Sequence, residues 1–428
     1  MKVYIYSSGT KIQPFGDDVS QVQVLTETLA QTQERACKRH GLELVRIDKP
    51  SEAVERPCLL AADYVYFSEK AIGDLIKTAR ERKVSGARLA LLRCVSVEHT
   101  LPLQDLTLED WEAPQGRAIY DLWLVPEGPL PDQPQEVRQA LAERCPALTV
   151  EMKEVVRAVR LPVLDDEERF FKYPFTSTIC CHISHWTHLL WLSQLSLGIS
   201  WNEFFRNHKW RSAFKAIWAV LRRFSINKWK FFSGMNVIGK NCDIHPSAYI
   251  EFSMIADGVK VGAGACIRNS LIGPDCIIAD HAVVTNSVIG NECYLTENFF
   301  LVSSLCFPGS TLGNLKTQMA VIGRDVYLHG WCSLLDAKFI GDIKVMHNGK
   351  RMSTGRSFMA SCVGHRAILG AKVLIHPGRE IPNDMLLVSR PEDVIATVPD
   401  NIPPRTPMVR DLGTLVALES LKKDKTRP

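Results

Sequence analysis

Apolar side chains return at every fifth or sixth position through the second half of the chain. The series comprises Ile238, Ile244, Ile250, Ile255, Val261, Ile267, Ile272, Ile278, Val284, Ile289 and Leu295. Its spacing of six, six and five repeats with a period of 17 residues. A helix needs apolar returns near 3.6 residues and an ordinary strand near 2, so neither explains the series. Short strands joined by turns, three to a coil, explain it, because stacked coils bury one apolar column on each side. The pattern predicts a parallel β-helix of hexapeptide repeats over residues 236–388.

The same spacing resumes later and is interrupted twice. The later positions are Ile322, Leu328, Val363, Leu369, Ile375 and Ile381. We therefore expect loops to leave the coil at about 296–321 and at about 341–357. Loops on a rigid scaffold often carry functional sites. The repeat also places Cys242, Cys276 and Cys293 in the small-residue column that faces inward, where cysteine acts as a small apolar side chain.

The first 165 residues alternate between strand-like and helix-like segments. Strands are expected at 2–6, 42–47, 58–67 and 87–94, and helices at 19–40 and 68–83. This alternation is typical of an α/β domain with a mainly parallel sheet. Residues 166–235 then read as a helical segment, and residues 389–428 as a C-terminal tail.

Composition narrows the class of protein. The net charge of +4 over 428 residues argues against a general affinity for nucleic acid. The start of the chain lacks the apolar run of an export signal, so the 13 cysteines are expected to be reduced thiols. No run of 18 apolar residues occurs, so the sequence predicts no membrane-spanning helix. These features favour a cytoplasmic protein.

Candidate phosphate chemistry lies where the first and third strands end. Ser8, Gly9, Thr10 and Lys11 follow the first strand, and Asp63 lies within the segment 58–67. Backbone N–H groups of such a loop can surround a phosphate, a lysine can neutralise its charge, and an aspartate can hold Mg²⁺. The alternative is an ordinary turn after a strand.

The middle segment combines tryptophan with positive charge. Residues 206–230 contain eight lysines or arginines and no acid. This composition suits an amphipathic helix on an anionic membrane surface, on the cytoplasmic face. The proposed contacts are Trp210, Arg211, Lys215, Trp218, Arg222 and Arg223. The alternatives are a helical linker packed on protein and, less favoured because no recognition motif accompanies the patch, an RNA contact.

The order of these parts resembles sugar-1-phosphate nucleotidyltransferases fused to a hexapeptide-repeat acyltransferase, as in the bifunctional N-acetylglucosamine-1-phosphate uridyltransferase/glucosamine-1-phosphate N-acetyltransferase. Residues 9–14 (GTKIQP) match the later part of the family's glycine-rich signature, and Ala62-Asp63 matches its metal-binding aspartate. The segments 343–356 and 363–378 resemble the acetyltransferase half. The resemblance implies a left-handed β-helix, a nucleotide-sugar or sugar-phosphate substrate, Mg²⁺, acyl-coenzyme A and a homotrimer. Ser7 replaces the first signature glycine, and the family's substrate lysine and acyl-transfer histidine have no counterpart.

The resemblance also directs attention to histidines at the coil surface. Such transferases use a histidine as general base, because imidazole titrates near neutral pH. We select His329, which adjoins an interruption, and His365. The cations Lys344, Lys350, Arg351 and Arg356 suit a phosphate of the substrate or of coenzyme A. Taken singly, each of these histidines fits an ordinary surface residue better than a catalytic base.

The sequence thus supports two functions. One is a transferase of sugar-nucleotide metabolism, working by nucleotidyl or acyl transfer to a sugar phosphate or glycolipid precursor at a membrane surface. The other is a catalytically inactive scaffold or binding protein built from the same parts.

Overall fold

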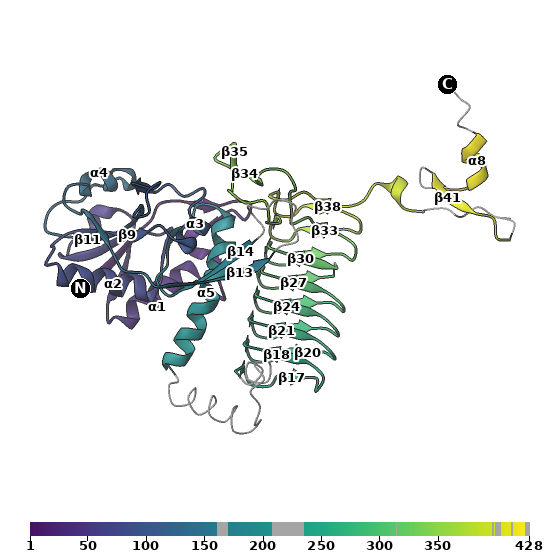
Figure 1. The fold of residues 1–428 in the computed structure, drawn as a ribbon, viewed down its shortest axis with the longest axis horizontal. Helices are drawn as coiled ribbons and strands as arrows, with labels where there is room; N and C mark the ends of the chain where they lie inside the picture. The colour runs from purple at the N-terminus through teal and green to yellow at the C-terminus, as the bar shows by residue number, and fades with distance from the viewer. Residues whose placement is uncertain are drawn as a thin grey trace.

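The computed structural model describes residues 1–160, 170–207, 235–313, 315–395, 398, 404–411 and 414–423. An α/β domain lies beside a tall stack of coils, and the C-terminal residues extend away from the stack (Figure 1). The predicted arrangement of an α/β domain followed by stacked parallel strands is confirmed.

A mixed sheet forms the centre of the N-terminal domain. Its strand order is β12-β9-β11-β7-β1-β6, with β10 on β11. The bounds are β1 (Lys2–Tyr6), β6 (Glu43–Ile47), β7 (Cys58–Ala62), β9 (Ala87–Leu92), β10 (Thr107–Glu109), β11 (Arg117–Val125) and β12 (Ala147–Thr149). Strands β6, β1 and β7 are parallel, whereas β11 runs antiparallel to both β7 and β9. The carboxyl ends of β1 and β7 therefore meet at one edge.

Helices cover this sheet, and one of them begins later than expected. They are α1 (Leu29–Arg39), α2 (Glu69–Glu81), α3 (Val95–Thr100) and α4 (Val137–Leu141). The predicted helix over 19–40 is wrong in its first ten residues. Thr28 caps α1 reciprocally with Gln31, which fixes the start at Leu29. The preceding residues form the 3₁₀ turn Val19–Gln21 and the strand pair β4 (Gln23–Val24) and β5 (Glu27–Thr28).

The predicted strand over 58–67 is two strands. It breaks at Asp63 and Tyr64, and β8 (Val65–Phe67) leaves the main sheet to pair with β15 (Cys180–His182). Strand β13 (Glu154–Arg160) pairs with β14 (Phe170–Thr176) in a long ribbon that crosses towards the coils (Figure 1). These pairings extend the N-terminal domain beyond residue 165. The described helical part of the middle segment is α5 (Trp186–Asn207).

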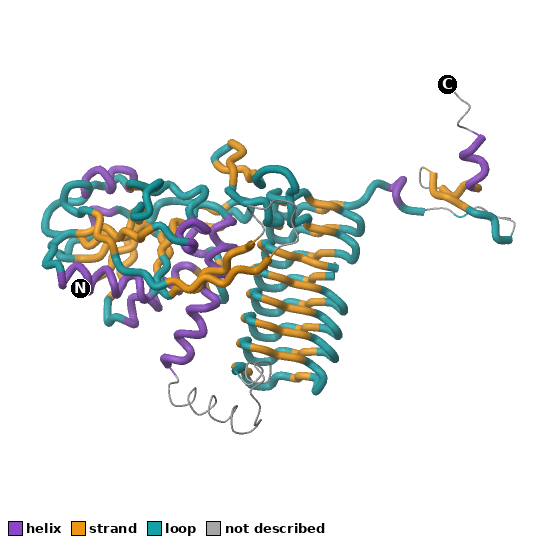
Figure 2. The backbone as a smooth tube through the Cα atoms, viewed as in Figure 1, coloured by secondary structure: helices purple, strands orange, loops and turns teal. Residues whose placement is uncertain are grey.

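The second half forms three rows of short parallel strands (Figure 2). The row that we call the interface sheet comprises β16 (Val237–Ile238), β19 (Met254–Ile255), β22 (Leu271–Ile272), β25 (Val288–Ile289), β28 (Leu305–Cys306), β31 (Val321–Ile322), β36 (Cys362–Val363) and β39 (Glu380–Ile381). The second row comprises β17 (Asp243–Ile244), β20 (Lys260–Val261), β23 (Ile277–Ile278), β26 (Tyr294–Leu295), β29 (Thr311–Leu312), β32 (Tyr327–Leu328), β37 (Ile368–Leu369) and β40 (Leu386–Leu387). The third comprises β18 (Tyr249–Glu251), β21 (Cys266–Arg268), β24 (Val283–Thr285), β27 (Phe300–Val302) and β30 (Lys316–Gln318), with the separate pair β33 (Ser333–Leu334) and β38 (Leu374–Ile375).

The period of 17 is visible in the register of these strands. Leu271 pairs with Val288, 17 residues on, and both cysteines of this stretch, Cys276 and Cys293, are buried. At one corner of four successive coils a residue with positive φ precedes a serine (Ser253, Ser270, Ser287 or Ser304), and the serine hydroxyl accepts the backbone N–H of the residue at the same corner one coil later. The Ser270 Oγ accepts in this way from the N–H of Ser287, at 3.1 Å. The repeated Asn-Ser pairs, Asn269-Ser270 and Asn286-Ser287, therefore form this corner in two of the coils.

The first predicted interruption, at 296–321, is wrong. The coil continues through it, but Leu305 pairs with Val321 after only 16 residues, and a buried threonine, Thr317, occupies an inward position. Both changes hide the repeat from a search for apolar returns. The second interruption is confirmed. Between β33 and β36 the chain leaves the coil and forms the hairpin of β34 (Lys344–His347) and β35 (Lys350–Ser353).

A shared apolar core joins the two halves. Leu305 and Val321 of the interface sheet point outward yet are fully buried, in one cluster with Leu189 and Leu190 of α5. The described part of the tail contains the 3₁₀ turn Pro391–Asp393, strands β41 (Met408–Asp411) and β42 (Thr414–Ala417), and helix α8 (Leu418–Lys423).

Candidate functional site

The predicted phosphate loop and the predicted metal ligand lie together. Ser8 follows β1 and Asp63 follows β7, so both sit at the same edge of the sheet. The Ser8 hydroxyl donates to Asp63 Oδ1 at 2.5 Å and lies 2.8 Å from the hydroxyl of Thr10. Gly9 between them has a φ of +68°, a conformation that glycine adopts without strain. The arrangement places a carboxylate and two hydroxyls around an exposed glycine turn.

The charges at this edge are partly balanced. Burial raises the pKa of Asp63, although the hydrogen bond from Ser8 acts in the opposite direction. Lys11 is exposed, and its Nζ lies 4.0 Å from Asp18 Oδ1. Such an exposed contact contributes little to stability, so the lysine can turn towards a ligand at small cost. The loop and Asp63 could hold a phosphate and a cation that the phosphate itself helps to bind.

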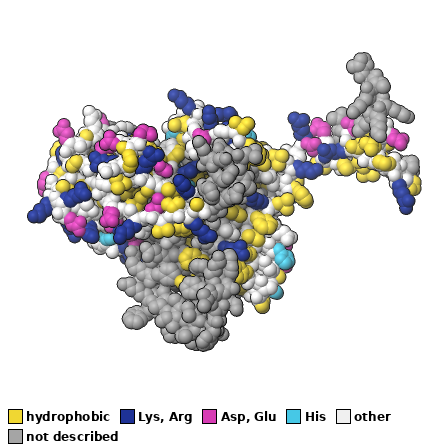
Figure 3. Space-filling view, in the orientation of Figure 1, with side chains coloured by type: hydrophobic (Ala, Val, Ile, Leu, Met, Phe, Trp, Pro, Cys, Tyr) yellow, Lys and Arg dark blue, Asp and Glu magenta, His cyan; other side chains and the backbone are white. Residues whose placement is uncertain are grey.

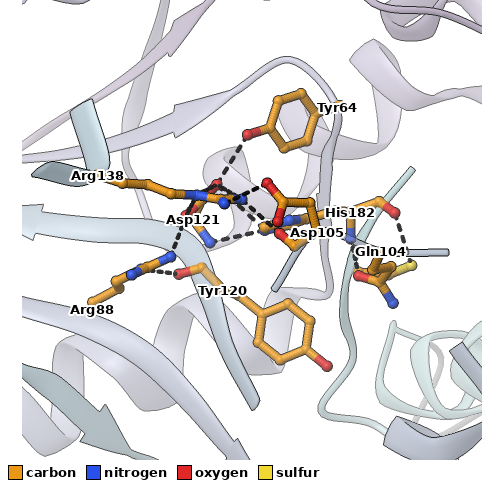
Figure 4. A network of polar contacts seen from close by, with 9 residues as sticks. Tyr64, Arg88, Gln104, Asp105, Tyr120, Asp121, Arg138 and His182 are labelled. Carbon is orange, nitrogen blue, oxygen red and sulfur yellow. Dashed lines mark hydrogen bonds and ion pairs between the residues drawn. The ribbon is translucent and has the colours of Figure 1, made fainter. Parts of the chain in front are cut away.

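A buried charge cluster that the sequence did not predict surrounds Asp121 (Figure 4). Asp121 of β11 is 1% exposed and accepts from Arg88 at 2.6 Å and from the Nε of Arg138 at 2.9 Å. The Tyr64 hydroxyl also donates to Asp121, at 2.9 Å. Since Tyr64 follows Asp63 in the chain, this cluster fixes the backbone that carries the predicted metal ligand.

A histidine completes the cluster. His182 Nε2 accepts a hydrogen bond from the backbone N–H of Asp121 at 2.9 Å, and the backbone N–H of His182 donates to Gln104 Oε1. Burial lowers the pKa of His182 to about 4, against the attraction of Asp121, so the ring is neutral at pH 7. Burial alone would raise the pKa of Asp121, but its interactions with His182, Arg138 and Arg88 together outweigh that effect and lower it. The cluster is thus an ionised carboxylate held by two arginines.

His365 lies at the contact between the domains rather than on the open coil surface. It is 1% exposed; its Nδ1 accepts the backbone N–H of Arg324 at 2.8 Å, and its Nε2 lies 3.1 Å from Asp17 Oδ2. With Nδ1 accepting, Nε2 carries the ring proton and donates it to Asp17. Neither nitrogen is left to take a proton from a substrate. The catalytic assignment of His365 stays a prediction, and these contacts give the ring a role in joining the domains.

The other predicted catalytic residues are spread over the coil surface. His329 is exposed after β32, with Nδ1 3.0 Å from the carbonyl oxygen of Gly330. Lys344, Lys350 and Arg351 are exposed on the β34–β35 hairpin, which projects from the stack with dark-blue side chains in Figure 3. Arg356 instead lies over the ring of Trp191, 5.6 Å from its centroid. Three of the four predicted cations therefore share one hairpin.

A cavity that the sequence gave no sign of lies between the ribbon β13–β14, helix α5 and the coils. Its volume is about 460 Å³. One part of its lining is aromatic, with Tyr173, Trp191 and Phe252, and another part is polar, with Asn269 and Asn286. Its residues come from both halves of the chain, which is why no local pattern marks them.

Two other predictions depend on what the structure describes. Among the described residues, no group of three or more histidine, cysteine or carboxylate side chains is placed to hold a metal ion. Within those same residues, no helix is long and apolar enough to cross a membrane. The proposed membrane contacts lie in 208–234, outside the described part of the chain. They are Trp210, Arg211, Lys215, Trp218, Arg222 and Arg223.

The carboxylate of Asp17 gives a prediction about how stability depends on pH. Burial alone would raise the pKa of Asp17, but the hydrogen bonds from His365 and Arg324 outweigh it and lower the pKa from 3.8 to about 2. The carboxylate therefore stabilises the fold above pH 3.8, and this contribution is lost as the pH falls towards 2. We expect Asp17→Asn to lower the free energy of unfolding by about 2 kcal/mol at pH 7 and to have almost no effect near pH 2. Urea unfolding of both proteins across this range measures it, and an equal difference at pH 7 and pH 2.5 would contradict the assignment.

Comparison with known families gives one match. A family model described as the GMPPB C-terminal domain matches residues 226–322, which is less than a quarter of the chain. The matched residues include the first coils of the stack, and they fit the C-terminal β-helix of a sugar nucleotidyltransferase. The match points to a function related to that class of enzyme. A comparison with curated proteins found no match.

Proposed function

We propose that the protein is a transferase of sugar-nucleotide metabolism, with its nucleotide site at the Ser8–Lys11 loop. The observation that carries the proposal is the pairing of this loop with Asp63 at the carboxyl ends of β1 and β7. Ligands of open α/β sheets bind at such an edge. The family match to the coils supports the same class of function independently.

Each residue of the loop has a distinct task in this proposal. The backbone N–H groups around Gly9 approach the phosphates of a nucleotide-sugar, and Lys11 neutralises part of their charge. Asp63, with the hydroxyls of Ser8 and Thr10 beside it, would hold Mg²⁺. One carboxylate fits this ion, because Mg²⁺ is usually bound by one or two carboxylates, substrate phosphates and water. The bound ion would supply positive charge where the phosphates are transferred.

The finer parts of the proposal concern the coils and the basic segment. Acyl-coenzyme A would be a co-substrate whose phosphates contact Lys344, Lys350 and Arg351, with His329 as the exposed candidate base. The segment 206–230 would hold the protein at an anionic membrane surface on the cytoplasmic side. A left-handed coil and a homotrimer complete this proposal, and both rest on the resemblance of the repeat.

A second candidate function is a binding protein without turnover. It is favoured by the engagement of both ring nitrogens of His365, which leaves this candidate base no nitrogen for a substrate proton. In this case the loop would bind a nucleotide-sugar as a signal or cargo. The two candidates differ in turnover, not in binding.

A pyrophosphate-release assay separates them. The protein is incubated with MgCl₂, a nucleoside triphosphate and a panel of sugar 1-phosphates, and product is followed by ³¹P NMR. The enzyme reading predicts turnover that Asp63→Asn reduces at least tenfold, because the carboxylate no longer holds the ion. Asp132→Asn is the control, since this exposed carboxylate follows β11 at the opposite edge of the sheet. Binding without turnover would leave the second candidate standing, and equal turnover by wild type and Asp63→Asn would contradict the assigned site.

A further inference from the structure

The loop Ser8–Lys11 continues directly into a small hairpin that reaches the coils. Strands β2 (Lys11–Ile12) and β3 (Asp17–Asp18) pair antiparallel, with Lys11 opposite Asp18 and Ile12 opposite Asp17. Residues 13–16 form its turn, closed by a hydrogen bond from the N–H of Gly16 to the carbonyl of Ile12 at 2.8 Å. We call residues 11–18 the strap. One end of the strap is the proposed phosphate loop, and the other end is its turn.

Aromatic packing holds the turn of the strap against the coils. Phe15 is 3% exposed and stacks on the ring of His365, with ring centroids 4.7 Å apart and planes 22° apart. Phe15 also lies 5.1 Å from the ring of Phe307, which is fully buried, and the rings of Phe307 and His365 are themselves 6.1 Å apart. A phenylalanine from the N-terminal domain thus joins two rings of the β-helix in one aromatic cluster.

Charged and polar contacts fix the orientation of the same turn. Asp17 Oδ1 accepts from Arg324 at 2.8 Å, and Asp17 Oδ2 accepts from His365 Nε2 at 3.1 Å. Asn383 accepts the backbone N–H of His365 and donates to the carbonyl of Phe15, both at 2.7 Å. Charge-assisted bonds with both carboxylate oxygens leave the Asp17 side chain little freedom to rotate. Together with Phe307, four successive coils of the stack therefore contribute to holding one short strap.

The strap is also connected to the loop by hydrogen bonds and packing. The N–H of Val19, just after the strap, donates to the carbonyl of Thr10 at 2.9 Å. The pairing of Lys11 with Asp18 and the fully buried side chain of Ile12 add to this connection. A shift of the turn by the coils would therefore be carried to Thr10 rather than absorbed between them.

We propose that the β-helix positions the phosphate loop through this strap, with Asp17, Arg324 and His365 as positioning residues. The part that concerns ligand affinity rests on the proposed function. The part that concerns loop order does not, because it follows from the contacts alone. The coils thereby act on the nucleotide site without touching the nucleotide.

Hydrogen–deuterium exchange of the full chain tests the order of the loop. The variants are His365→Phe, which keeps the stacking ring and removes its hydrogen bonds, and the milder Asp17→Asn. The control is Arg366→Gln, the adjacent residue on the same turn, whose ion pair with exposed Asp384 touches no strap residue. We expect peptides covering residues 7–18 to exchange at least fivefold faster in the two variants and unchanged in the control. Peptides covering 271–289 should stay protected in all, which shows that the coils remain folded.

The same proteins are then titrated with a nucleotide-sugar panel and Mg²⁺. Faster exchange with about tenfold weaker binding in the variants supports the inference in full. Unchanged exchange at residues 7–18 would overturn the positioning of the loop by the coils. Faster exchange with unchanged affinity would overturn the effect of that positioning on the nucleotide site. If wild type binds nothing while the variants exchange faster, the proposed function fails and the positioning of the loop by the coils stands.

Discussion

Asp121→Asn is expected to lower the free energy of unfolding by about 3–5 kcal/mol, measured by urea unfolding of the full chain. The substitution keeps the shape of the side chain but removes the charge that both Arg88 and Arg138 face. Arg88 contacts Asp121 from the start of β9, where its side chain is only 12% exposed. Leaving a buried guanidinium without its carboxylate lowers the free energy of unfolding far more than doing so at an exposed site.

Asp105→Asn is the matched control for this prediction. Asp105 contacts the same Arg138, at 2.6 Å, but its side chain is 90% exposed. An exposed ion pair contributes at most about 1 kcal/mol, so this variant should unfold close to wild type. Equal losses for Asp121→Asn and Asp105→Asn would show that burial of the carboxylate is not what gives the cluster its importance.

The second large effect is expected at the contact between the domains. Leu305 points out of the coil and is fully buried in the apolar cluster that α5 forms with the interface sheet. Leu305→Asp would place a carboxylate without a partner in this apolar contact. We expect a loss of about 3–5 kcal/mol, or separation of the two halves with rapid proteolysis between them.

Phe300→Asp provides the control within the same coil. Phe300 also points outward, from β27, but it is 44% exposed, so a carboxylate there stays in water. Its effect should be within about 0.5 kcal/mol. Limited proteolysis and urea unfolding of both variants decide the matter. Similar behaviour of the two would contradict the packing of α5 on the interface sheet.

The coils could be predicted because their information is local and repeated. Each anchor from Ile250 to Leu295 is a buried side chain, and a period of 17 repeats this requirement over many residues. The prediction failed where the repeat changed length. Between Leu305 and Val321 the coil loses one residue, and Thr317 fills an inward position with a hydroxyl. A search for apolar side chains at a fixed spacing misses both changes, although the parallel pairing of the strands continues.

The site was predictable only in its first part. Ser8 and Asp63 each follow a strand, and parallel strands bring their carboxyl ends to one edge. The Asp121 cluster was missed because its members come from separate strands and helices, and each looks like an ordinary surface charge in sequence. His365 was expected at the coil surface but is buried against Asp17, which lies 348 residues away. No local signal predicts such a contact.

The central claim is that the loop beside Asp63 binds a nucleotide-sugar. Isothermal calorimetry of the purified full chain, with a panel of nucleotide-sugars in the presence and absence of Mg²⁺, tests it most directly. The account predicts binding to at least one member in the presence of Mg²⁺, weakened at least tenfold by Asp63→Asn and unchanged by Asp132→Asn. Absence of binding across the panel, or equal binding by wild type and Asp63→Asn, would contradict it.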